Sequence, residues 1–481
     1  MTEPATDLHY LSATDALRLF QSRELSPAEL MAAVIARAEA VEPTVNAFAA
    51  TFYDQALDAA RAAADRYAAG TPVGPLDGLP VAVKEEAPIA GQVNSLGSLP
   101  LRDVVATETA EFVRRIIDAG GIVHARTTTP EFSCAPFTWT KLWGVTRNPW
   151  NTAYSPGGSS GGSAAALAAG MTTLATGSDI GGSIRIPSSF CGVVGFKPPY
   201  GRVPETDTFN LDHYCHEGPL ARTVADCALL ENVIAGPHWS DVASLRPKLT
   251  IPSDLGDVRG LRIALSTDLG CYDVDADVVA NTLAAADRLR AVGAEVTEVL
   301  LPWRRADITA AARIHFGMIF GPSIREICAA HAGDLNTYTV RFVEESDAIA
   351  KDQFVAGLAL EGELYAPLGR LLDEYDALIC PTFAISALPA EYDTDQPILV
   401  NGVPCDEWWD VMMTLPFNIA SRCPVLSIPS GLSRDGVPTG LSVVARTYDD
   451  VTAFRVAAAH ERTFPGVACS PWPMSSGASV L

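Results

Sequence analysis

The chain has 481 residues, with 57 acidic against 34 basic side chains and a formal net charge of −23. Such an acidic excess repels nucleic acid and anionic membrane surfaces, so we expect neither as a partner. No apolar run approaches the roughly 18 residues of a membrane-spanning helix, and the first ten residues lack the basic and apolar segments of a secretory signal, so we expect a cytoplasmic protein.

The ten cysteines fit a reducing compartment, because they form no Cys-x-x-Cys pair. Cys191 and Cys380 lie in apolar runs that predict burial. We therefore expect reduced thiols in the core rather than a disulfide framework.

The N-terminal half is predicted to begin with helices and then to alternate with strands. Residues 26–29 read Ser-Pro-Ala-Glu, with the N-cap serine, first-turn proline and third-position glutamate of a capping box. Apolar and small-residue patterns then indicate helices at 56–69, 108–119 and 163–173, and strands at 81–84 and 122–125.

The C-terminal half continues the alternation of strands and helices. Short apolar runs predict strands at 261–265, 295–301, 377–380, 425–428 and 441–445, with helices between them. The long helical stretch at 307–374 is typical of a cap over one face. The expected fold class is α/β, with a mixed, mostly parallel central sheet flanked by helices, plus a helical cap.

No linker or low-complexity run divides the chain, so we expect one domain over residues 1–481. Within it we distinguish N-terminal helices at 1–70, a catalytic core at 71–235 and a helical cap insertion at 303–375. The chemistry should lie in the core segment, because its glycine and serine content is concentrated in two loops.

These two loops are the strongest functional signal in the chain. Residues 157–163 read Gly-Gly-Ser-Ser-Gly-Gly-Ser, and residues 177–183 read Gly-Ser-Asp-Ile-Gly-Gly-Ser. Successive glycines are found where the backbone takes unusual dihedral angles or approaches a ligand closely. Glycines before a serine also let consecutive amides converge on one point, as an oxyanion requires. The loops therefore predict a nucleophilic serine beside an oxyanion hole.

A serine nucleophile needs a base, and Lys84 at the end of the predicted strand 81–84 is the best candidate. Burial disfavours the charged ammonium, so a buried lysine can accept a proton. The alternative is a structural lysine that ends the strand and pairs with Glu85 or Glu86. The residues alone leave both interpretations open.

At these motifs the chain resembles the amidase signature family, serine hydrolases with a Ser-Ser-Lys triad. The resemblance rests on Pro-Val-Ala-Val-Lys at 80–84, Gly-Gly-Ser-Ser-Gly-Gly at 157–162 and Asp-Ile-Gly-Gly-Ser-Ile-Arg at 179–185. It continues through further matching segments at 144–150, 191–198, 218–226, 376–382 and 417–431. It thus covers most of the chain.

The resemblance implies a role for each matched residue. Ser183 would attack the carbonyl, Ser159 would relay the proton, and Lys84 would be the base, with a cis peptide before Ser159. The oxyanion hole would use the backbone amides of Ile180, Gly181 and Gly182, together with that of Ser183. Supporting contacts would come from Ser160, Asp179 and Arg185, although the last two would otherwise be an ordinary exposed pair. The family chemistry implies no cofactor and no metal.

The expected activity is cleavage of the C–N bond of aryl or apolar amides, including anilides, through an acyl-enzyme on Ser183. Carbamates, among them urethanes, and esters are expected as further small-molecule substrates, and a urethanase is an alternative main activity. The aromatic segment 132–143, with Ser133 and Cys134, and the loop 207–214 are expected to line the pocket. We expect a monomer or a homodimer.

A glutamine-hydrolysing amidotransferase subunit is a second alternative. Two departures from the family pattern argue mildly against it: Glu85 stands where aspartate is more usual, and Ser442 stands where many members have glutamine. Such a subunit would also require partner subunits and an RNA-bound complex.

A third alternative is an esterase of the α/β-hydrolase type, because residues 157–161 also satisfy Gly-x-Ser-x-Gly with Ser159 at the centre. That motif needs a buried strand before it, whereas residues 148–156 are rich in turn residues. His460, the histidine near the C-terminus that could serve as its base, lies in a helical pattern and is expected at the surface.

His213 and His216 could indicate a metal site. No second cluster of ligands accompanies them in the sequence. We therefore expect a loop near the mouth of the active site instead.

Overall fold

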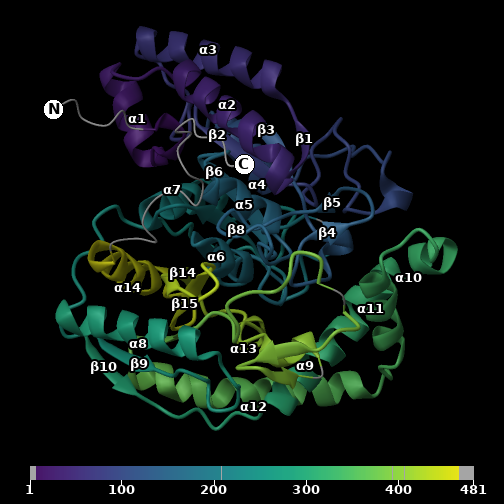
Figure 1. Cartoon of the computed structure of the whole chain (residues 1–481). Coiled ribbons are helices and arrows are strands. Elements are labelled where there is room, and N and C mark those ends of the chain that lie inside the picture. Colours follow the sequence, from purple (N-terminus) through teal and green to yellow (C-terminus); the bar gives the residue numbers. More distant parts are fainter. Residues whose placement is uncertain (1–6, 207–208, 393, 406, 465–481) are drawn as a thin grey trace, which may run out of the picture.

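An eleven-stranded sheet runs through the molecule, and helices pack against it (Figure 1). The computed structural model describes residues 7–206, 209–392, 394–405 and 407–464. Residues 1–6 of the chain start, and residues 207 and 208 of the predicted pocket loop, thus lie outside the described residues. No helix in the described ranges is both long and apolar enough to cross a membrane.

The sheet has the spatial order β1-β3-β2-β6-β8-β7-β14-β15-β11-β9-β10. Its strands in chain order are β1 (Phe48–Thr51), β2 (Pro80–Lys84), β3 (Ile122–Thr127), β6 (Leu174–Ser178), β7 (Val194–Lys197), β8 (Glu217–Ala221), β9 (Arg262–Leu265), β10 (Glu295–Glu298), β11 (Ala377–Pro381), β14 (Val425–Leu432) and β15 (Pro438–Ala445). Two small separate sheets pair β4 (Trp139–Thr140) with β5 (Gly144–Val145), and β12 (Ile398–Val400) with β13 (Val403–Cys405).

The sheet is mixed, as predicted, but in the described part of the chain only four of its ten strand pairs are parallel and six are antiparallel, so it lacks the expected parallel majority. Strand β2 runs parallel to β3 and β6, and β9 runs parallel to β10 and β11, whereas the pairs between these groups are antiparallel. The parallel part therefore lies toward the two ends of the sheet. Lys84, the predicted base, is at the carboxyl end of β2, inside one of the parallel groups.

Helices cover both faces of the sheet. In chain order they are α1 (Ala13–Ser22), α2 (Pro27–Val45), α3 (Tyr53–Ala69), α4 (Glu111–Asp118), α5 (Gly161–Ala168), α6 (Arg185–Cys191), α7 (Val224–Ile234), α8 (Ala276–Ala291), α9 (Arg305–Met318), α10 (Phe320–His331), α11 (Thr337–Asp347), α12 (Gln353–Glu374), α13 (Leu415–Ile419) and α14 (Asp450–Thr463). Short 3₁₀ turns lie at η1 (Leu8–Tyr10), η2 (Leu99–Leu101), η3 (Glu131–Ser133) and η4 (Trp408–Val411).

The two faces of the sheet separate two hydrophobic cores, and β15 shows how. Leu441 and Val443 contribute to the core that contains α7, α8 and α14, whereas Val444 contributes to the core under the cap. This alternation is the expected consequence of the two-residue period of a strand. Helices α5 and α6, which follow the two serine loops, are buried along their whole length.

The capping box at the start of α2 is confirmed. Ser26 Oγ accepts from the amide of Ala28 at 3.2 Å, and the amide of Ser26 donates to Glu29 Oε2 at 2.9 Å. The predicted helix at 163–173 is shorter than expected and ends at Ala168. Gly170 takes a positive φ of 76° there, and the chain then enters strand β6.

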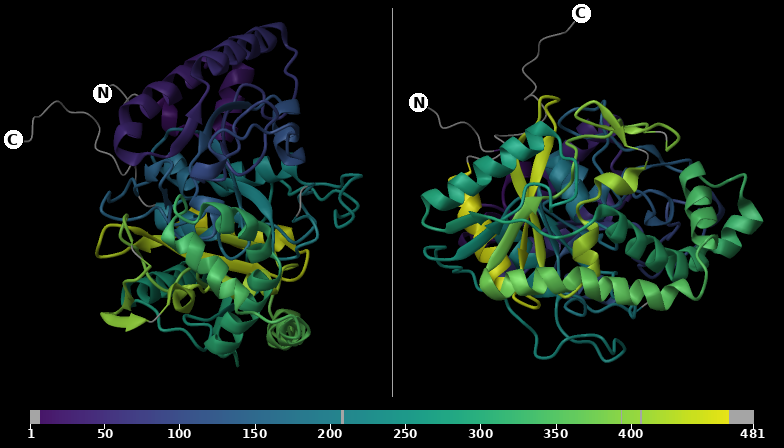
Figure 2. Two further views of the ribbon diagram at one scale, coloured as in Figure 1. Left: turned by 90° about the vertical axis from the view of Figure 1, so that its right-hand side faces the viewer. Right: turned by 90° about the horizontal axis from the view of Figure 1, so that it is seen from below.

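Four helices, α9 to α12, form the cap expected over one face, and Figure 2 shows α12 crossing one end of the molecule with α10 and α11 beside it. Glu131 lies outside the cap, is fully buried, and holds the cap in place through hydrogen bonds. Its Oε2 accepts from the backbone amide of Asn336 at 2.7 Å and from Thr339 Oγ1 at 2.8 Å. The cap is therefore anchored beside the aromatic segment that leads to the site.

His460 lies in a helix, as predicted, but its expected place at the surface is wrong. The side chain is 1 % exposed on α14, and its Nε2 donates to the carbonyl of Pro429 at 3.0 Å. His460 lies two turns after Ala453 and one turn after Val456, so it shares the helix face of these two buried residues. This face packs on β14. The helix buries several sides, so an isolated histidine in it is not a reliable sign of exposure.

Candidate active site

Lys84 is buried at the end of β2, whose five residues are all buried between β3 and β6. The side chain is 1 % exposed. Its Nζ donates to Ser159 Oγ at 2.7 Å and to Ser178 Oγ at 2.8 Å. The structure thus brings the predicted base into direct contact with the predicted relay serine.

Ser159 lies in the first serine loop, immediately before α5, and is fully buried. The peptide between Gly158 and Ser159 is cis, as the family resemblance implies. Gly157 takes a φ of 80°, in the left-handed region that favours glycine. The next residue connects the two serine loops, because the amide of Ser160 donates to the carbonyl of Ser183 at 3.1 Å.

Ser183 lies on the second serine loop, between β6 and α6, and keeps 8 % of its surface exposed. It lines a narrow cavity. Gly182 before it has a φ of 129°, and a Cβ at that position would collide with Thr414. The glycine is therefore required both by its dihedral angle and by close packing.

Asp179 and Arg185 form a fully buried pair that spans this loop, so the alternative of an exposed pair is wrong. Arg185 donates to Asp179 through Nε and Nη2, both at 2.8 Å, and Asn418 Nδ2 donates to Asp179 at 2.9 Å. Burial alone would raise the pKa of Asp179, but Arg185 and these hydrogen bonds hold it well below its usual range. The carboxylate is thus charged and fixes the loop from within.

The amides of the loop divide into two sets. That of Gly182 donates to Asp179 Oδ1 at 2.8 Å, so this predicted oxyanion donor is already engaged. The amides of Ile180, Gly181 and Ser183 donate to no other group within the described part of the chain. Backbone donors without a partner beside a serine are the arrangement that an oxyanion uses.

His216 supports the same loop from behind and does not face the mouth of the site. Its carbonyl accepts from the amide of Asp179 at 2.7 Å, and its Nδ1 donates to the carbonyl of Asp179 at 3.0 Å. Burial lowers the pKa of His216 to about 3 and that of the neighbouring Lys197 to about 7. Lys197 Nζ lies 3.3 Å from His216 Nε2.

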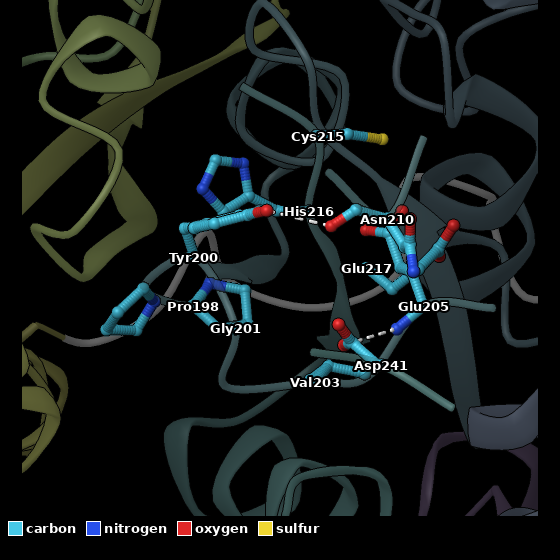
Figure 3. Close-up of a pocket in the computed structure, with 11 residues that line it drawn as sticks. Pro198, Tyr200, Gly201, Val203, Glu205, Asn210, Cys215, His216, Glu217 and Asp241 are labelled. Atoms are coloured by element: carbon cyan, nitrogen blue, oxygen red, sulfur yellow. Dashed lines mark hydrogen bonds between the residues drawn. The ribbon is translucent and has the colours of Figure 1, made fainter. Parts of the chain in front are cut away.

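Figure 3 shows the small cavity behind this loop, in which His216 lies beside Tyr200. The hydroxyl of Tyr200 donates to the carbonyl of Asn210 at 2.8 Å, and the amide of Glu205 donates to Asp241 at 3.2 Å. These bonds hold the loop that joins β7 to β8 in place.

His213 belongs to a different cluster, which joins this loop to the cap. Ligand-type atoms of Asp212, His213 and His315 lie within 4.8 Å of one another, a spacing that a metal ion could share. In the structure His315 Nε2 donates to Asp212 at 2.6 Å, and His213 Nε2 lies 3.1 Å from Glu361. Burial alone would lower the pKa of His315, but its bonds with Asp212 and Glu361 raise it. A protonated His315 between two carboxylates accounts for these contacts.

The alternative pairing partners of Lys84 differ in the structure. Glu85 turns away and accepts from Ser95 Oγ at 2.9 Å and from the amide of Leu96 at 3.0 Å. Glu86 Oε2 lies 3.0 Å from Lys84 Nζ and also accepts from Ser133 Oγ. Lys84 is therefore hydrogen-bonded to Ser159 and paired with a carboxylate at the same time.

Two cavities meet at the second serine loop, and both are lined by Ser133, Ile180 and Phe320. The narrow pocket, about 30 Å³, contains Ser183, and its other walls are largely apolar: Cys134, Ala135, Pro136, Gly158, Gly181, Ile186, Phe316, Phe342, Trp408, Trp409 and Met412. The wide chamber, about 370 Å³, contains Ser178 and Glu86. The predicted pocket residues Ser133 and Cys134 both lie in these walls, as does Phe209 of the predicted loop.

Several residues of the site were not predicted. Ser178 lies inside the second serine loop motif, between Gly177 and Asp179, where a buried strand end was a usable signal. Phe316 and Trp409 reach the narrow pocket from the cap and from η4. Nothing in their local sequence indicates a place beside Ser183.

The α/β-hydrolase alternative fails on local structure. It requires a strand directly before Ser159, but residues 146–160 contain no strand, and all of them are described. His460, the base that it would use, is bonded to Pro429 on α14.

The sequence and the fold are similar to those of known proteins. The family model described as Amidase matches residues 29–454. The chain is 34 % identical over 469 residues to an acylamidase of Rhodococcus erythropolis, covering 97 % of each chain. It is 32 % identical over 500 residues to a glutamyl-tRNA(Gln) amidotransferase subunit from Chloroflexus aggregans, covering 95 % of this chain and 97 % of that one.

A crystal structure of a bacterial aryl acylamidase of the amidase signature family matches with a TM-score of 0.88 at 30 % identity, covering 97 % of each chain. The mixed sheet flanked by helices is thus shared with a solved member. The chain belongs to the amidase family, the amidase signature enzymes, and is an amide-hydrolysing enzyme that acts on non-peptide C–N bonds.

Proposed function

We propose that this enzyme is an acylamidase for aryl or apolar amides, with Ser183 as nucleophile, Ser159 as proton relay and Lys84 as base. The observation that carries the proposal is the 2.7 Å hydrogen bond between Lys84 Nζ and Ser159 Oγ. Ser159 is in turn held to the nucleophile loop through the bond from the Ser160 amide to the Ser183 carbonyl. A serine needs such a base to become nucleophilic.

The reaction follows from this order of groups. As Ser183 Oγ bonds to the carbonyl carbon, its proton passes to Ser159, and the proton of Ser159 passes to Lys84 Nζ. The negative charge on the carbonyl oxygen is stabilised by the unengaged amides of Ile180 and Gly181, with that of Ser183. The proton returns through Ser159 to the leaving nitrogen, and water then releases the acyl group.

The two cavities suggest how the substrate is oriented. The leaving nitrogen must lie near the relay, and the side chains beside Lys84 line the wide chamber. The amine part of the substrate should therefore occupy the wide chamber, and the acyl part the narrow apolar pocket. A cavity of about 370 Å³ lies within the size range of small-molecule sites.

The similarity to a protein named acylamidase and to one named aryl acylamidase supports amides as the main substrates. Carbamates, including urethanes, and esters have the same planar carbonyl, so we propose them as further substrates. The amidotransferase relatives make glutamine a second candidate. The largely apolar wall of the narrow pocket favours aryl or alkyl acyl groups over the charged head of glutamine.

The test is hydrolysis of a matched aryl amide, aryl carbamate and aryl ester, with glutamine beside them. Ser183→Ala and Lys84→Ala should each lower amide turnover by roughly 10³-fold or more, because the members of such a unit act together. Ser22→Ala, at an exposed position on α1, is the matched control and should keep full activity. Turnover that survives Ser183→Ala but is lost in Ser159→Ala would move the nucleophile and overturn the proposal.

A further inference from the structure

We infer that Glu86 is a positioning residue of this site, whose carboxylate stabilises the positive charge that Lys84 gains when it takes the proton of Ser159. The inference rests on the proposed function. It extends the proton path of Ser183, Ser159 and Lys84 by one electrostatic partner. Glu86 lies outside the sequence segments by which the chain resembles the family.

The contact is short and largely shielded from water. Glu86 Oε2 lies 3.0 Å from Lys84 Nζ, with side-chain exposures of 21 % for Glu86 and 2 % for Lys84. Ion pairs at a protein surface contribute little, but the Coulomb interaction grows as the local dielectric constant falls. Because Lys84 is almost fully buried, its ion pair with Glu86 is stronger than a pair at the protein surface.

The backbone beside the pair is held so that Glu86, and not Glu85, faces the lysine. Arg126 on β3, itself 1 % exposed, donates through Nη2 to the carbonyls of Lys84 at 3.3 Å and of Glu85 at 2.9 Å, and also to that of Ala87. The side chain of Glu85 is occupied by residues 95 and 96. The turn after β2 therefore directs the buried carboxylate of Glu85 toward residues 95 and 96, and that of Glu86 toward Lys84 Nζ.

Such a partner would act during the first step of the reaction. When Ser183 Oγ forms its bond to the carbonyl carbon, one proton moves from Ser183 to Ser159 and another from Ser159 to Lys84. No proton needs to reach Glu86. Its negative charge stabilises the new ammonium of Lys84 throughout the step. The buried aspartate of a Ser-His-Asp triad stabilises its imidazolium in the same way.

Glu86 is equipped to stay ionised. Burial alone would raise the pKa of Glu86, but Lys84 and the hydrogen bonds from Ser133 and Ser178 lower it below its ordinary value. Its carboxylate therefore carries a negative charge at neutral pH.

The same pairing also favours the protonated lysine before substrate arrives, so Glu86 has two opposite effects. Other charged groups nearby are engaged elsewhere: Glu85 with residues 95 and 96, Arg126 with backbone carbonyls, and Asp179 with Arg185 under the nucleophile loop. The wall of the wide chamber adds three more acidic side chains, Glu111, Glu205 and Glu217. Among the described residues, Glu86 is the one that forms an ion pair with Lys84.

The decisive experiment is the pH profile of kcat/KM for Glu86→Gln with an aryl amide. Removing the negative charge 3.0 Å from Lys84 Nζ makes that nitrogen a weaker base, by about 1–3 pH units. The pH of half-maximal kcat/KM should therefore fall by about 1–2 units. The plateau should fall roughly 3- to 10-fold, because a weaker base accelerates the step less, with a Brønsted slope of about one half. The two profiles therefore converge or cross at acidic pH.

Two controls and one substitute experiment separate positioning from a general structural effect. Glu86→Asp keeps the charge and should keep the half-maximal pH near that of the unchanged enzyme. Glu205→Gln removes a charge from the same chamber and should not move the half-maximal pH, whatever its effect on rate. If Glu86→Gln does not fold, Glu86→Ala is assayed with added formate, which should restore plateau activity in proportion to its concentration.

The inference is overturned if Glu86→Gln lowers the rate equally at every pH, or if the profile does not move. For Glu86→Ala, failure of formate to restore activity overturns it. The proposed function has its own readout. If Ser183→Ala and Lys84→Ala abolish turnover while the Glu86 profiles coincide, only the role of Glu86 is refuted.

Discussion

The fully buried pair of Asp179 and Arg185 predicts a large stability change from a small substitution. Asp179→Asn keeps the size of the side chain but removes the charge that balances Arg185. The asparagine side chain would keep one oxygen that can accept from Arg185 and from the amide of Gly182. Breaking one partner of a buried pair costs about 3–5 kcal/mol, and because one oxygen is retained we expect a loss of about 3 kcal/mol.

The pH dependence of this loss has a definite sign. The pKa of Asp179 is held well below the ordinary value of about 3.9 in the unfolded chain. Its stabilising contribution is therefore fully present above that unfolded value and is lost as the pH falls toward the folded one. The difference between the two proteins should be constant from pH 5 to 7, at about 3 kcal/mol, and should shrink below about pH 4.

Urea unfolding followed by circular dichroism at pH 7 and at pH 3.5 measures both effects. The matched control is Asp58→Asn, whose partner Arg61 lies at 2.7 Å on the exposed face of α3. That substitution should cost less than about 1 kcal/mol. Equal effects of the two substitutions, or a change below about 1 kcal/mol for Asp179→Asn, would refute the claim that the buried pair fixes the loop.

Three further substitutions test separate parts of the structure. Because the pKa of Lys197 is lowered to about 7, the unfolded chain binds one proton more above that pH, and stability rises as pH increases. Lys197→Met should remove about 1.4 kcal/mol per pH unit of this slope, measured by urea unfolding between pH 7.5 and 9.5; an unchanged slope contradicts it. Glu131→Gln should loosen the cap and cost about 1–3 kcal/mol, and faster proteolysis of the region 305–374 would show it, whereas unchanged cleavage would not fit. Trp409→Phe widens the narrow pocket and should raise the kcat/KM of a benzoyl over an acetyl amide roughly 10-fold; a fixed ratio would place the acyl group elsewhere.

Local sequence patterns were sufficient for some of the elements next to the chemistry. The capping box of α2 and the strand that ends at Lys84 depend on neighbouring residues alone. The glycines at 157 and 182 were informative for the same reason, because each reports a backbone angle that other residues rarely adopt. Strands β1, β6, β7 and β8 were not predicted, since each has only four or five residues and β8 contains Gly218 and Pro219.

Contacts between distant segments could not be read in this way. Which of Glu85 and Glu86 faces Lys84 is decided by Arg126 and by residues 95 and 96, which lie outside the local pattern. The narrow pocket takes aromatic side chains from the cap, more than a hundred residues after Ser183 in the chain. Nor could burial of His460 be predicted from helical periodicity alone.

The most direct test of the central claim is to identify the acylated residue. The enzyme is mixed with an aryl ester, quenched during the first turnover and digested with trypsin, which releases residues 148–185 with both Ser159 and Ser183 in one peptide. Fragmentation mass spectrometry then locates the acyl group. We predict the added mass on Ser183; an acyl group on Ser159, or turnover without any acylated serine, would contradict the account.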